Sequence, residues 1–409
     1  MKKGWTETTF GDAAEFTGKP RGINYAQYDR IPFLPMERVS EGGGEPSEYD
    51  WRPGASIRSG NYFEKGDCLL AKITPCFENG KQAVTNELPA DFGVASTELI
   101  PFRGKAGISS KYFLYYVLLD TKARRQLAQK MEGATGRQRI PMSVLREWPI
   151  LLPPLSEQER IAGILMKIQG AIRLQDRIIQ ILRDLKKSTL RHLFTHGTRG
   201  EKTKMTEIGE MPESWEVVKL GEVFETQLGK MLSQKARVGD DPRPYLRNKN
   251  VQWGRIDLSD MLCMDFSERE RRKFLLRPGD LLICEGGEPG RAAIWSGDIK
   301  ECYYQKALHR LRPKDERGSN CFLALWLTYA FQSQNLYGIA GASSTIAHLP
   351  EIQLKQLPIP IAPAVEQYEI TRVLNDLSSR VMAHENRKSL YQDMFSSTLG
   401  FLYAEGGGW

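Results

Sequence analysis

Cysteine and histidine are scarce in this sequence, with six and five copies among 409 residues. No two cysteines form a Cys-x-x-Cys pair, the spacing typical of zinc ribbons and dithiol redox sites. His192 and His196 stand four residues apart, but no His-Glu-x-x-His pattern surrounds them. The sequence therefore predicts no metal site, and we expect reduced thiols, buried as small apolar side chains.

Long apolar runs are also missing. No run approaches the roughly 18 residues that a membrane-spanning helix needs. The first residues lead into polar sequence and not into the apolar core of a signal peptide. We expect a cytoplasmic protein without a membrane segment.

The motifs of several enzyme classes are absent as well. The sequence has no Gly-x-x-x-x-Gly-Lys-Ser/Thr phosphate loop. It has no Asn/Asp-Pro-Pro-aromatic motif of amino-methyltransferases, which residues 241–245 (DPRPY) match only loosely. Residues 286–291 are rich in glycine but do not form a Rossmann fingerprint. These absences predict a chain with no catalytic centre and no cofactor of its own.

The chain does carry a basic excess and enough apolar residues for a core. Its net charge is +7, and 41% of its residues are hydrophobic. A modest positive charge suits a polyanionic partner such as nucleic acid, although many soluble proteins are equally basic. The length predicts two or more domains.

An internal duplication is the most informative feature of the sequence. Trp5 matches Trp215, and the Gly-Asp of residues 66–67 matches that of residues 279–280. The proline-rich stretches at 149–154 and 358–363 match in the same order, at an offset that stays between 208 and 213 residues. One unit is therefore used twice, and the period is far too long for a solenoid.

Each copy is predicted to consist of a mixed α/β (α+β) domain followed by a long helix. Short apolar runs bounded by glycine and proline predict strands, whereas residues 111–119 and 321–327 predict buried helices. After each domain, apolar residues recur at spacings of three and four. Ser156 is the expected cap of the first long helix and Gly197 its expected stop, and Val365 replaces the capping serine in the second copy. The predicted boundaries are 1–153 and 198–362 for the domains, and 154–197 and 363–405 for the helices.

This order of elements favours a particular geometry. The two helices are expected to pair as an antiparallel coiled coil with pseudo-two-fold symmetry between the copies. A helix of about 40 residues, rising about 1.5 Å per residue, would span roughly 60 Å. Two domains held that far apart suit two DNA half-sites separated by an unread gap, with different half-sites because the loops differ. A spacer in a tandem protein of another function would look the same at this level.

Residues 152–161 (LPPLSEQERI) resemble the junction between a target-recognition domain and its spacer helix in specificity subunits of type I restriction–modification enzymes. Residues 360–367 (PIAPAVEQ) are a degraded form of that junction. Residues 208–221 (IGEMPESWEVVKLG) resemble the usual entry to the second recognition domain. The segments 72–81 (KITPCFENGK), 245–251 (YLRNKNV) and 285–291 (EGGEPGR) are similar to loops of these domains.

The resemblance covers nearly the whole chain and implies a division of labour. It implies two target-recognition domains that read double-stranded DNA, and a chain that is not itself an enzyme. Two methyltransferase subunits would dock on the spacer helices and bring S-adenosylmethionine. Motor-nuclease subunits would add ATP- and Mg-dependent translocation and cleavage. A self-sufficient DNA methyltransferase and a coiled-coil protein scaffold are the alternative functions.

Loops of the right composition are the candidates for DNA contact. Base edges are read by Arg, Lys, Asn and Gln, and phosphates by Lys, Arg, Ser, Thr and backbone amides. For any single residue, a solvated surface role is the plain alternative. The candidates are Lys19, Arg21, Thr135, Arg137, Gln138, Arg139, Lys230, Lys235, Arg237, Arg247, Asn248, Lys249, Asn250, Arg291, Ser343, Ser344 and Thr345.

Overall fold

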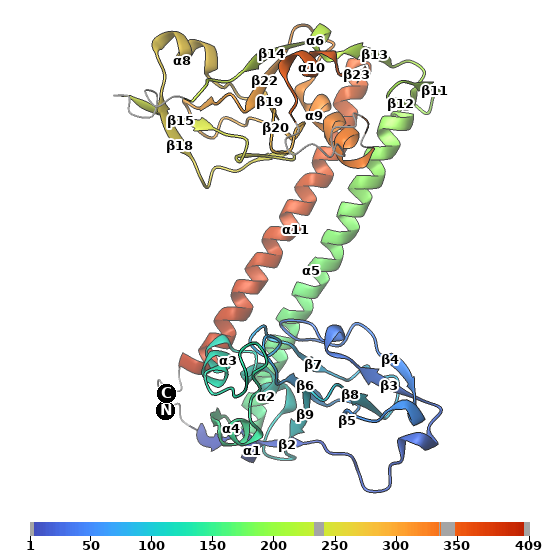
Figure 1. The fold of residues 1–409 in the computed structure, drawn as a ribbon, viewed down its shortest axis with the longest axis vertical. Coiled ribbons are helices and arrows are strands. Elements are labelled where there is room, and N and C mark those ends of the chain that lie inside the picture. The colour runs from blue at the N-terminus through green and yellow to red at the C-terminus, as the bar shows by residue number, and fades with distance from the viewer. Residues whose placement is uncertain (1–3, 233–240, 335, 337–347, 405–409) are drawn as a thin grey trace. The chain divides into compact units, whose positions relative to one another are not determined.

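The structure is a computed structural model that describes residues 4–232, 241–334, 336 and 348–404. The candidates Lys235, Arg237, Ser343, Ser344 and Thr345 lie outside these residues. The chain forms two compact units (Figure 1). The first unit runs to Arg177 and includes the chain from Glu385 onwards, and the second unit is Ile178–His384.

The first unit contains two four-stranded sheets and a strand pair that closes the domain. One sheet has the order β2 (Ala14–Phe16), β9 (Leu99–Gly104), β6 (Cys68–Ala71), β7 (Gln82–Val84). The other has the order β4 (Asp50–Pro53), β3 (Arg30–Leu34), β8 (Phe92–Ala95), β5 (Asn61–Glu64). β1 (Thr6–Thr9) pairs antiparallel with β10 (Pro149–Leu152), so the start and the end of the domain lie together. Its short helices are α1 (Phe10–Ala13), α2 (Lys111–Val117), α3 (Thr121–Ala128) and α4 (Met142–Glu147).

The second unit repeats the first four-stranded sheet and the closing strand pair and has a three-stranded second sheet, which confirms the duplication. Its four-stranded sheet has the order β14 (Phe224–Leu228), β22 (Leu308–Pro313), β19 (Leu281–Cys284), β20 (Ala292–Ile294). A second sheet has the order β18 (Leu262–Asp265), β15 (Pro242–Leu246), β21 (Tyr303–Tyr304). β13 (Glu216–Lys219) pairs with β23 (Pro358–Ile361) as the closing pair. The helices are α6 (Leu220–Val223), α8 (Glu268–Phe274), α9 (Asn320–Thr328) and α10 (Glu351–Gln356).

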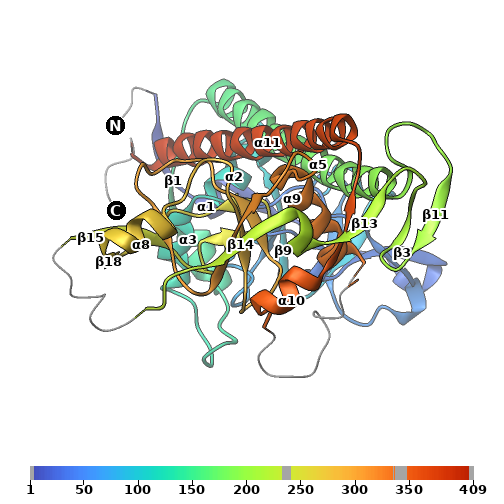
Figure 2. The same ribbon diagram turned by 90° about the horizontal axis from the view of Figure 1, so that it is seen from above.

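Two hairpins of the second unit have no counterpart among the described strands of the first. β16 (Val251–Gln252) pairs with β17 (Arg255–Ile256). β11 (Thr203–Thr206) pairs with β12 (Gly209–Pro212), and this hairpin lies beside β13 (Figure 2). Ile208 and Met211 of the second hairpin are buried in the core of the unit.

A long helix follows each domain, α5 (Leu155–His196) and α11 (Ala364–Ala404). In the first unit, Leu399 of α11 shares a core with Leu165 of α5, and Lys388 Nζ lies 2.5 Å from Asp176 Oδ1. In the second unit, Ile370 of α11 shares a core with Phe194 of α5. The end of each helix therefore lies beside the start of the other, and the expected antiparallel pairing is confirmed.

The expected cap at Ser156 is wrong, because α5 begins one residue earlier, at Leu155. α11 begins at Ala364, which is 209 positions later, although it lacks the serine. A buried glutamine fixes both starts: Gln158 Nε2 donates to the carbonyls of Pro153 and Ile108, and Gln367 Nε2 donates to those of Ala362 and Arg317. The stop at Gly197 is confirmed, since Gly197 has φ +62° and its amide donates to Leu193.

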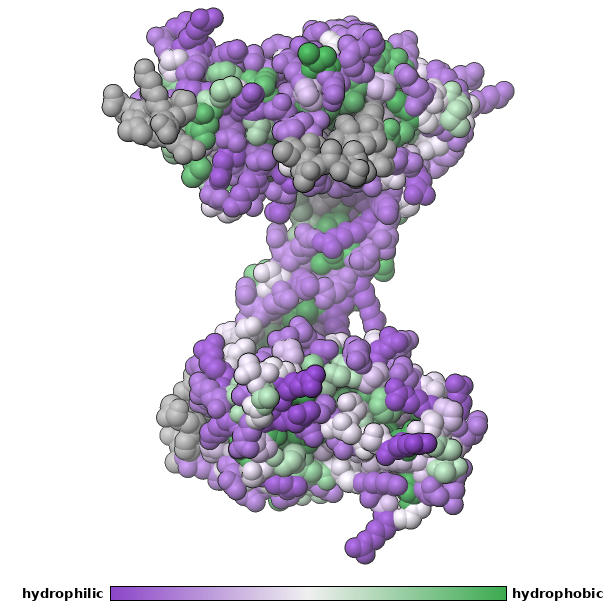
Figure 3. All heavy atoms as spheres, in the orientation of Figure 1, coloured by the Kyte–Doolittle hydropathy of each residue, from purple (hydrophilic) through white to green (hydrophobic). Residues whose placement is uncertain are grey.

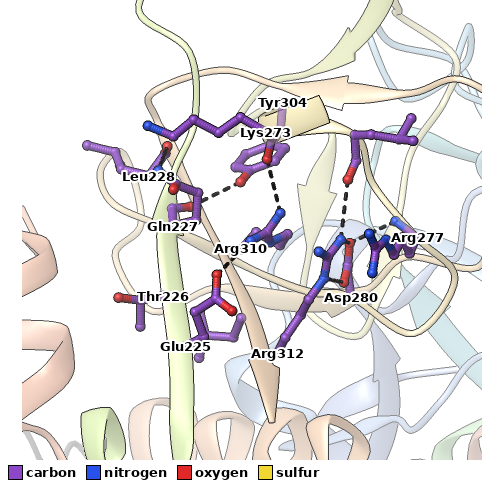
Figure 4. Close-up of polar contacts among 12 residues, drawn as sticks. Glu225, Thr226, Gln227, Leu228, Lys273, Arg277, Asp280, Tyr304, Arg310 and Arg312 are labelled. Atoms are coloured by element: carbon purple, nitrogen blue, oxygen red, sulfur yellow. Dashed lines mark hydrogen bonds and ion pairs between the residues drawn. The ribbon is translucent and has the colours of Figure 1, made fainter. Parts of the chain in front are cut away.

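A buried ion pair is also repeated. Asp67 Oδ1 lies 2.6 Å from the Arg103 guanidinium, and Asp280 Oδ1 lies 2.5 Å from that of Arg312. The second carboxylate oxygen accepts a backbone amide in each copy, from Glu64 in the first and from Arg277 in the second. Figure 4 shows the copy in the second unit. In each copy, the aspartate of the shared Gly-Asp thus ties its turn to the corresponding strand, β9 in the first unit and β22 in the second.

Candidate nucleic-acid interface

Several loops leave the four-stranded sheet of the first unit at one edge. β6 ends and β9 begins there, because Ala71 pairs with Leu99, and β2 ends close by, because Phe16 pairs with Phe102. The loops of this edge are residues 17–24, 72–81 and 96–98. Together with residues 132–139 we call them the first loop edge.

Residues 132–139 fold against the loop that follows β6. Arg139 forms β-bridges with Ile73 and Glu132, and the amide of Thr74 donates to the carbonyl of Gln138 at 2.9 Å. Gly133 and Gly136 have positive φ angles of 122° and 79°, which make this tight turn possible. The structure thus brings together two segments that are about 60 residues apart in the sequence, the KITPCFENGK loop and the candidates at 135–139.

The candidate residues of this turn differ in how exposed they are and in whether another residue already binds them. Thr135 and Arg137 are exposed and Gln138 is half-buried. Arg139 is committed to Glu98, since its Nε lies 3.1 Å and 3.0 Å from the two carboxylate oxygens. Within the part of the chain that the structure describes, Arg137 pairs with no carboxylate. Arg137 is therefore the side chain of this turn that is best placed to meet a phosphate or a base.

The ion pair between Arg139 and Glu98 gives a pH-dependent prediction. Hydrogen bonds from Arg139 lower the pKa of Glu98. A lowered carboxyl pKa adds stability that is present at neutral pH and is lost as the pH falls below about 4. We expect Glu98→Gln to destabilise the first unit by less than about 1 kcal/mol at pH 7, because Arg139 is about half exposed. Urea unfolding at pH 7 and pH 3 checks this, and an equal difference at both values would contradict it.

Lys19 and Arg21 lie in the loop that follows β2, and both are exposed. Lys19 Nζ lies 4.3 Å from the centre of the Tyr25 ring. The loop leaves the sheet beside residues 72–81, so these two cations belong to the first loop edge.

The second unit builds the corresponding edge from other residues. β19 ends at Cys284, opposite Leu308 of β22, and β14 ends at Leu228, opposite His309. The loops of this edge are residues 229–230, 285–291 and 305–307. Together with the adjoining turn 247–250 we call them the second loop edge.

Arg247, Asn248 and Lys249 lie at the turn of the second loop edge. The Arg247 guanidinium and Lys249 Nζ lie 2.9 Å and 2.8 Å from the same Asp260 oxygen. Lys249 is exposed, whereas Arg247 and Asn248 are half-buried. This turn offers one exposed cation and an amide beside it.

Three candidates have internal partners. Asn250 is buried, and its Nδ2 donates to the carbonyls of Asp257 and Asp260. Lys230 Nζ lies 2.7 Å from Glu270 Oε2 and donates to the carbonyl of Asp265. Arg291 donates to the carbonyl of Asn248 and pairs with Glu288. These groups hold loops in place, and we leave Asn250 and Lys230 out of the proposed interface.

Two exposed or half-buried lysines of these edges are missing from the sequence-based candidates. Lys72 opens the KITPCFENGK loop, and its carbonyl accepts the amide of Ile140. Lys306 is exposed in the turn between β21 and β22, and its amide donates to the carbonyl of Lys230. A basic residue within two positions of a buried strand of the repeat was the signal that could have identified both.

The described residues hold no group of three or more His, Cys, Asp or Glu side chains that could bind a metal ion. Within the same residues, no helix is long and apolar enough to cross a membrane. The loop edges offer cations, amides and hydroxyls, the groups that contact phosphates and base edges in nucleic-acid complexes.

Comparison with known proteins identifies the family. A family model described as "Type I restriction modification DNA specificity domain" matches residues 2–183 and again residues 212–390. The chain belongs to this family. It is a specificity subunit, the component of a type I restriction–modification system that recognises DNA and does not catalyse its reactions.

Curated relatives agree with this assignment. The chain is 29% identical to the EcoAI specificity subunit of Escherichia coli over 92% of its own length and 78% of that protein. It is 26% identical to the putative MjaX specificity subunit of Methanocaldococcus jannaschii over 79% and 74% of the two chains. A third match, to the E. coli EcoEI specificity subunit, is 34% identical but covers only 41% of this chain and 28% of that protein.

Solved structures share the fold. The specificity subunit from M. genitalium has a TM-score of 0.61 at 16% identity, covering 97% of this chain and 96% of that one. A chain from a study entitled "Structural basis underlying complex assembly and conformational transition of the type I R-M system" has a TM-score of 0.56 at 18% identity, covering 98% of both. The two-domain fold with two long helices is therefore that of the family.

Proposed function

We propose that the two loop edges of this specificity subunit read the two halves of a bipartite, asymmetric DNA target. The observation that carries the proposal is the repetition itself: one sheet topology presents the same edge twice, with different residues in its loops. Arg137, Thr135, Lys19 and Arg21 represent the first edge, and Lys249, Asn248 and Lys306 the second. Two domains with the same sheet but different loops would recognise different DNA half-sites.

The proposed complex has the partners that the family resemblance implies. Two methyltransferase subunits carry S-adenosylmethionine, and motor-nuclease subunits carry ATP and Mg. Support comes from the long helices, which keep apolar side chains exposed after they have paired (Figure 3). Leu174 of α5 and Leu390 of α11 in the first unit, and Ile181 and Leu185 of α5 and Met382 of α11 in the second unit, are each 47–65% exposed. Apolar side chains in such number on one pair of helices mark a protein contact.

An exchange of domains tests the proposal. Residues 1–153 are replaced by the corresponding domain of a relative with a different target, and adenine methylation is mapped across a genome. We expect one half of the methylated sequence to change, while the other half and the gap stay the same. An unchanged target would favour the scaffold alternative, and methylation by the isolated chain would favour the self-sufficient methyltransferase.

A single substitution tests the first loop edge more finely. We expect Arg137→Ala to weaken binding of the cognate duplex by the assembled methyltransferase about 10- to 100-fold, since a good charge-assisted contact contributes about 1–3 kcal/mol. Fluorescence anisotropy at fixed salt measures it. Arg125→Ala, on α3 of the same domain, is the matched control. Equal affinities for Arg137→Ala and wild type would remove this residue from the interface.

A further inference from the structure

The two units differ where each recognition domain meets the long helices. In the first unit, a cavity of about 70 Å³ lies between α2 and α5, and its lining includes Tyr112, Tyr115 and Tyr116. In the second unit, a cavity of about 560 Å³ lies in the corresponding place, between α9, α5 and α11. The second cavity is thus large enough for a bulky side chain.

The residues that line the two cavities correspond at the offset of 209 that relates α5 to α11. Cys321, Ala324 and Leu325 of α9 stand in the places of Tyr112, Tyr115 and Tyr116 of α2. On α11, Asn375, Ser378 and Met382 stand in the places of Met166, Gln169 and Arg173 on α5. The second cavity is therefore open because smaller side chains replace three tyrosines.

The tyrosines have a definite role in the first unit. The Gly44 amide donates to Tyr115 Oη at 2.6 Å, and Tyr116 Oη donates to Gln169 Oε1 at 3.1 Å. Gln169 Nε2 in turn donates to the carbonyl of Gly42. These bonds tie the first domain to α5 through aromatic side chains. Leu325 and Ser378 cannot form the corresponding bonds in the second unit.

The open cavity is apolar on some walls and cationic on others. Trp253, Leu190, Ile294 and Val381 supply apolar surface. Lys186 of α5 and Arg255 of β17 bring positive charge, and no Asp or Glu is found among the described residues of its lining. Burial lowers the pKa of Lys186, which means that its ammonium has lost part of its hydration. An aromatic ring accompanied by carboxylates would complement both kinds of wall.

We propose that this cavity receives an aromatic side chain, flanked by acidic residues, from a docked methyltransferase subunit. This rests on the proposed function. The tyrosines of the first unit show that aromatic rings fill the corresponding cavity there. The cations in the lining of the second cavity are the reason to expect acidic residues beside the ring. The cavity is also continuous with the exposed apolar surface of the helices, because Met382 belongs to both. The second domain would thereby gain from its partner the anchor that the first domain supplies itself.

Cys321 provides a reporter inside the cavity, and Cys263 is an exposed reference thiol in the same unit. Alkylation by iodoacetamide is followed by mass spectrometry on the isolated chain and on its complex with methyltransferase subunits. We expect assembly to slow alkylation of Cys321 at least about tenfold, as for a fully desolvated interface centre, while Cys263 is unaffected. Equal rates for Cys321 in both states would overturn the proposal. So would a Cys321 that is already protected in the isolated chain, or protected by a second copy of this chain.

A filled cavity gives the second arm of the experiment. The double variant Ala324→Tyr, Leu325→Tyr restores the side chains of the first unit, and Ile352→Tyr on exposed α10 is the matched control. We expect the double variant, but not the control, to bind methyltransferase subunits about tenfold more weakly, and Lys186→Glu to do the same. An unchanged affinity of the folded double variant contradicts the proposal.

A photo-crosslinking amino acid in place of Met382, which lies at the exposed rim of the cavity, identifies the occupant without filling the cavity. The crosslinked peptide of the methyltransferase subunit should contain Phe, Tyr or Trp next to Asp or Glu, and a peptide without them would overturn the proposal. If the unmodified chain recruits no methyltransferase subunit, the proposed function itself fails. If methyltransferase subunits bind but Cys321 is alkylated as fast as before, only the inference about this cavity fails, and the proposed function stands.

Discussion

Replacing Asp280 with alanine will lower the free energy of unfolding of the second unit by about 3–5 kcal/mol, the usual cost of removing one partner of a buried ion pair. Asp280 is almost fully buried, and Arg312 donates to both of its oxygens, at 2.5 Å and 2.7 Å. One of these oxygens also accepts the amide of Arg277 (Figure 4). The alanine variant would leave a partly buried guanidinium and a turn amide without an acceptor.

Chemical denaturation combined with hydrogen exchange of each unit measures this effect. Asp315→Ala is the control, because Asp315 pairs with Arg317 and both side chains are 40–48% exposed. That variant should leave the unfolding free energy almost unchanged, because an exposed ion pair contributes little to stability. Asp67→Ala should reproduce the large effect in the first unit, since the same turn is built there. Similar small losses for Asp280→Ala and Asp315→Ala would show that the repeated ion pair contributes little.

The fold could be predicted because its signals are periodic or repeated. The apolar spacing of three and four predicted α5 and α11, and the constant offset predicted two domains of one topology. The cap at Ser156 was predicted wrongly for a physical reason. Local capping is worth about 1 kcal/mol, whereas the helix start is fixed by Gln158, which donates to a carbonyl 50 residues away.

The candidate site was harder to predict, because the composition of a loop does not reveal its partners. Lys230 looks like a free cation in sequence, but Glu270 binds it from 40 residues away. Asn250 lies in a polar stretch, but its amide is used by carbonyls of the next turn. Only tertiary structure separates such groups from Arg137, which is exposed and pairs with no carboxylate among the described residues.

Replacing Glu366 with alanine will loosen the second recognition domain from its helix. Glu366 is fully buried, and it belongs to the Glu-Gln pair that both copies share. Its carboxylate accepts the Trp215 indole N–H at 3.0 Å and the Thr198 amide at 2.6 Å. Both donors would lose their acceptor, at a cost of about 1–3 kcal/mol each. We expect hydrogen exchange to accelerate at Thr198, at Trp215 and in the first turn of α11.

Glu369→Ala is the matched control, because Glu369 lies one turn further along α11 and accepts a hydrogen bond from the exposed Thr198 hydroxyl. It should leave exchange at Trp215 unchanged. The functional effect of Glu366→Ala should be confined to one half of the DNA target, because the carboxylate joins Thr198 and Trp215, at the entry of the second domain, to α11 within the second unit. Mismatch tolerance at each half-site measures this, and equal relaxation of both halves would mean that the domains do not read DNA independently.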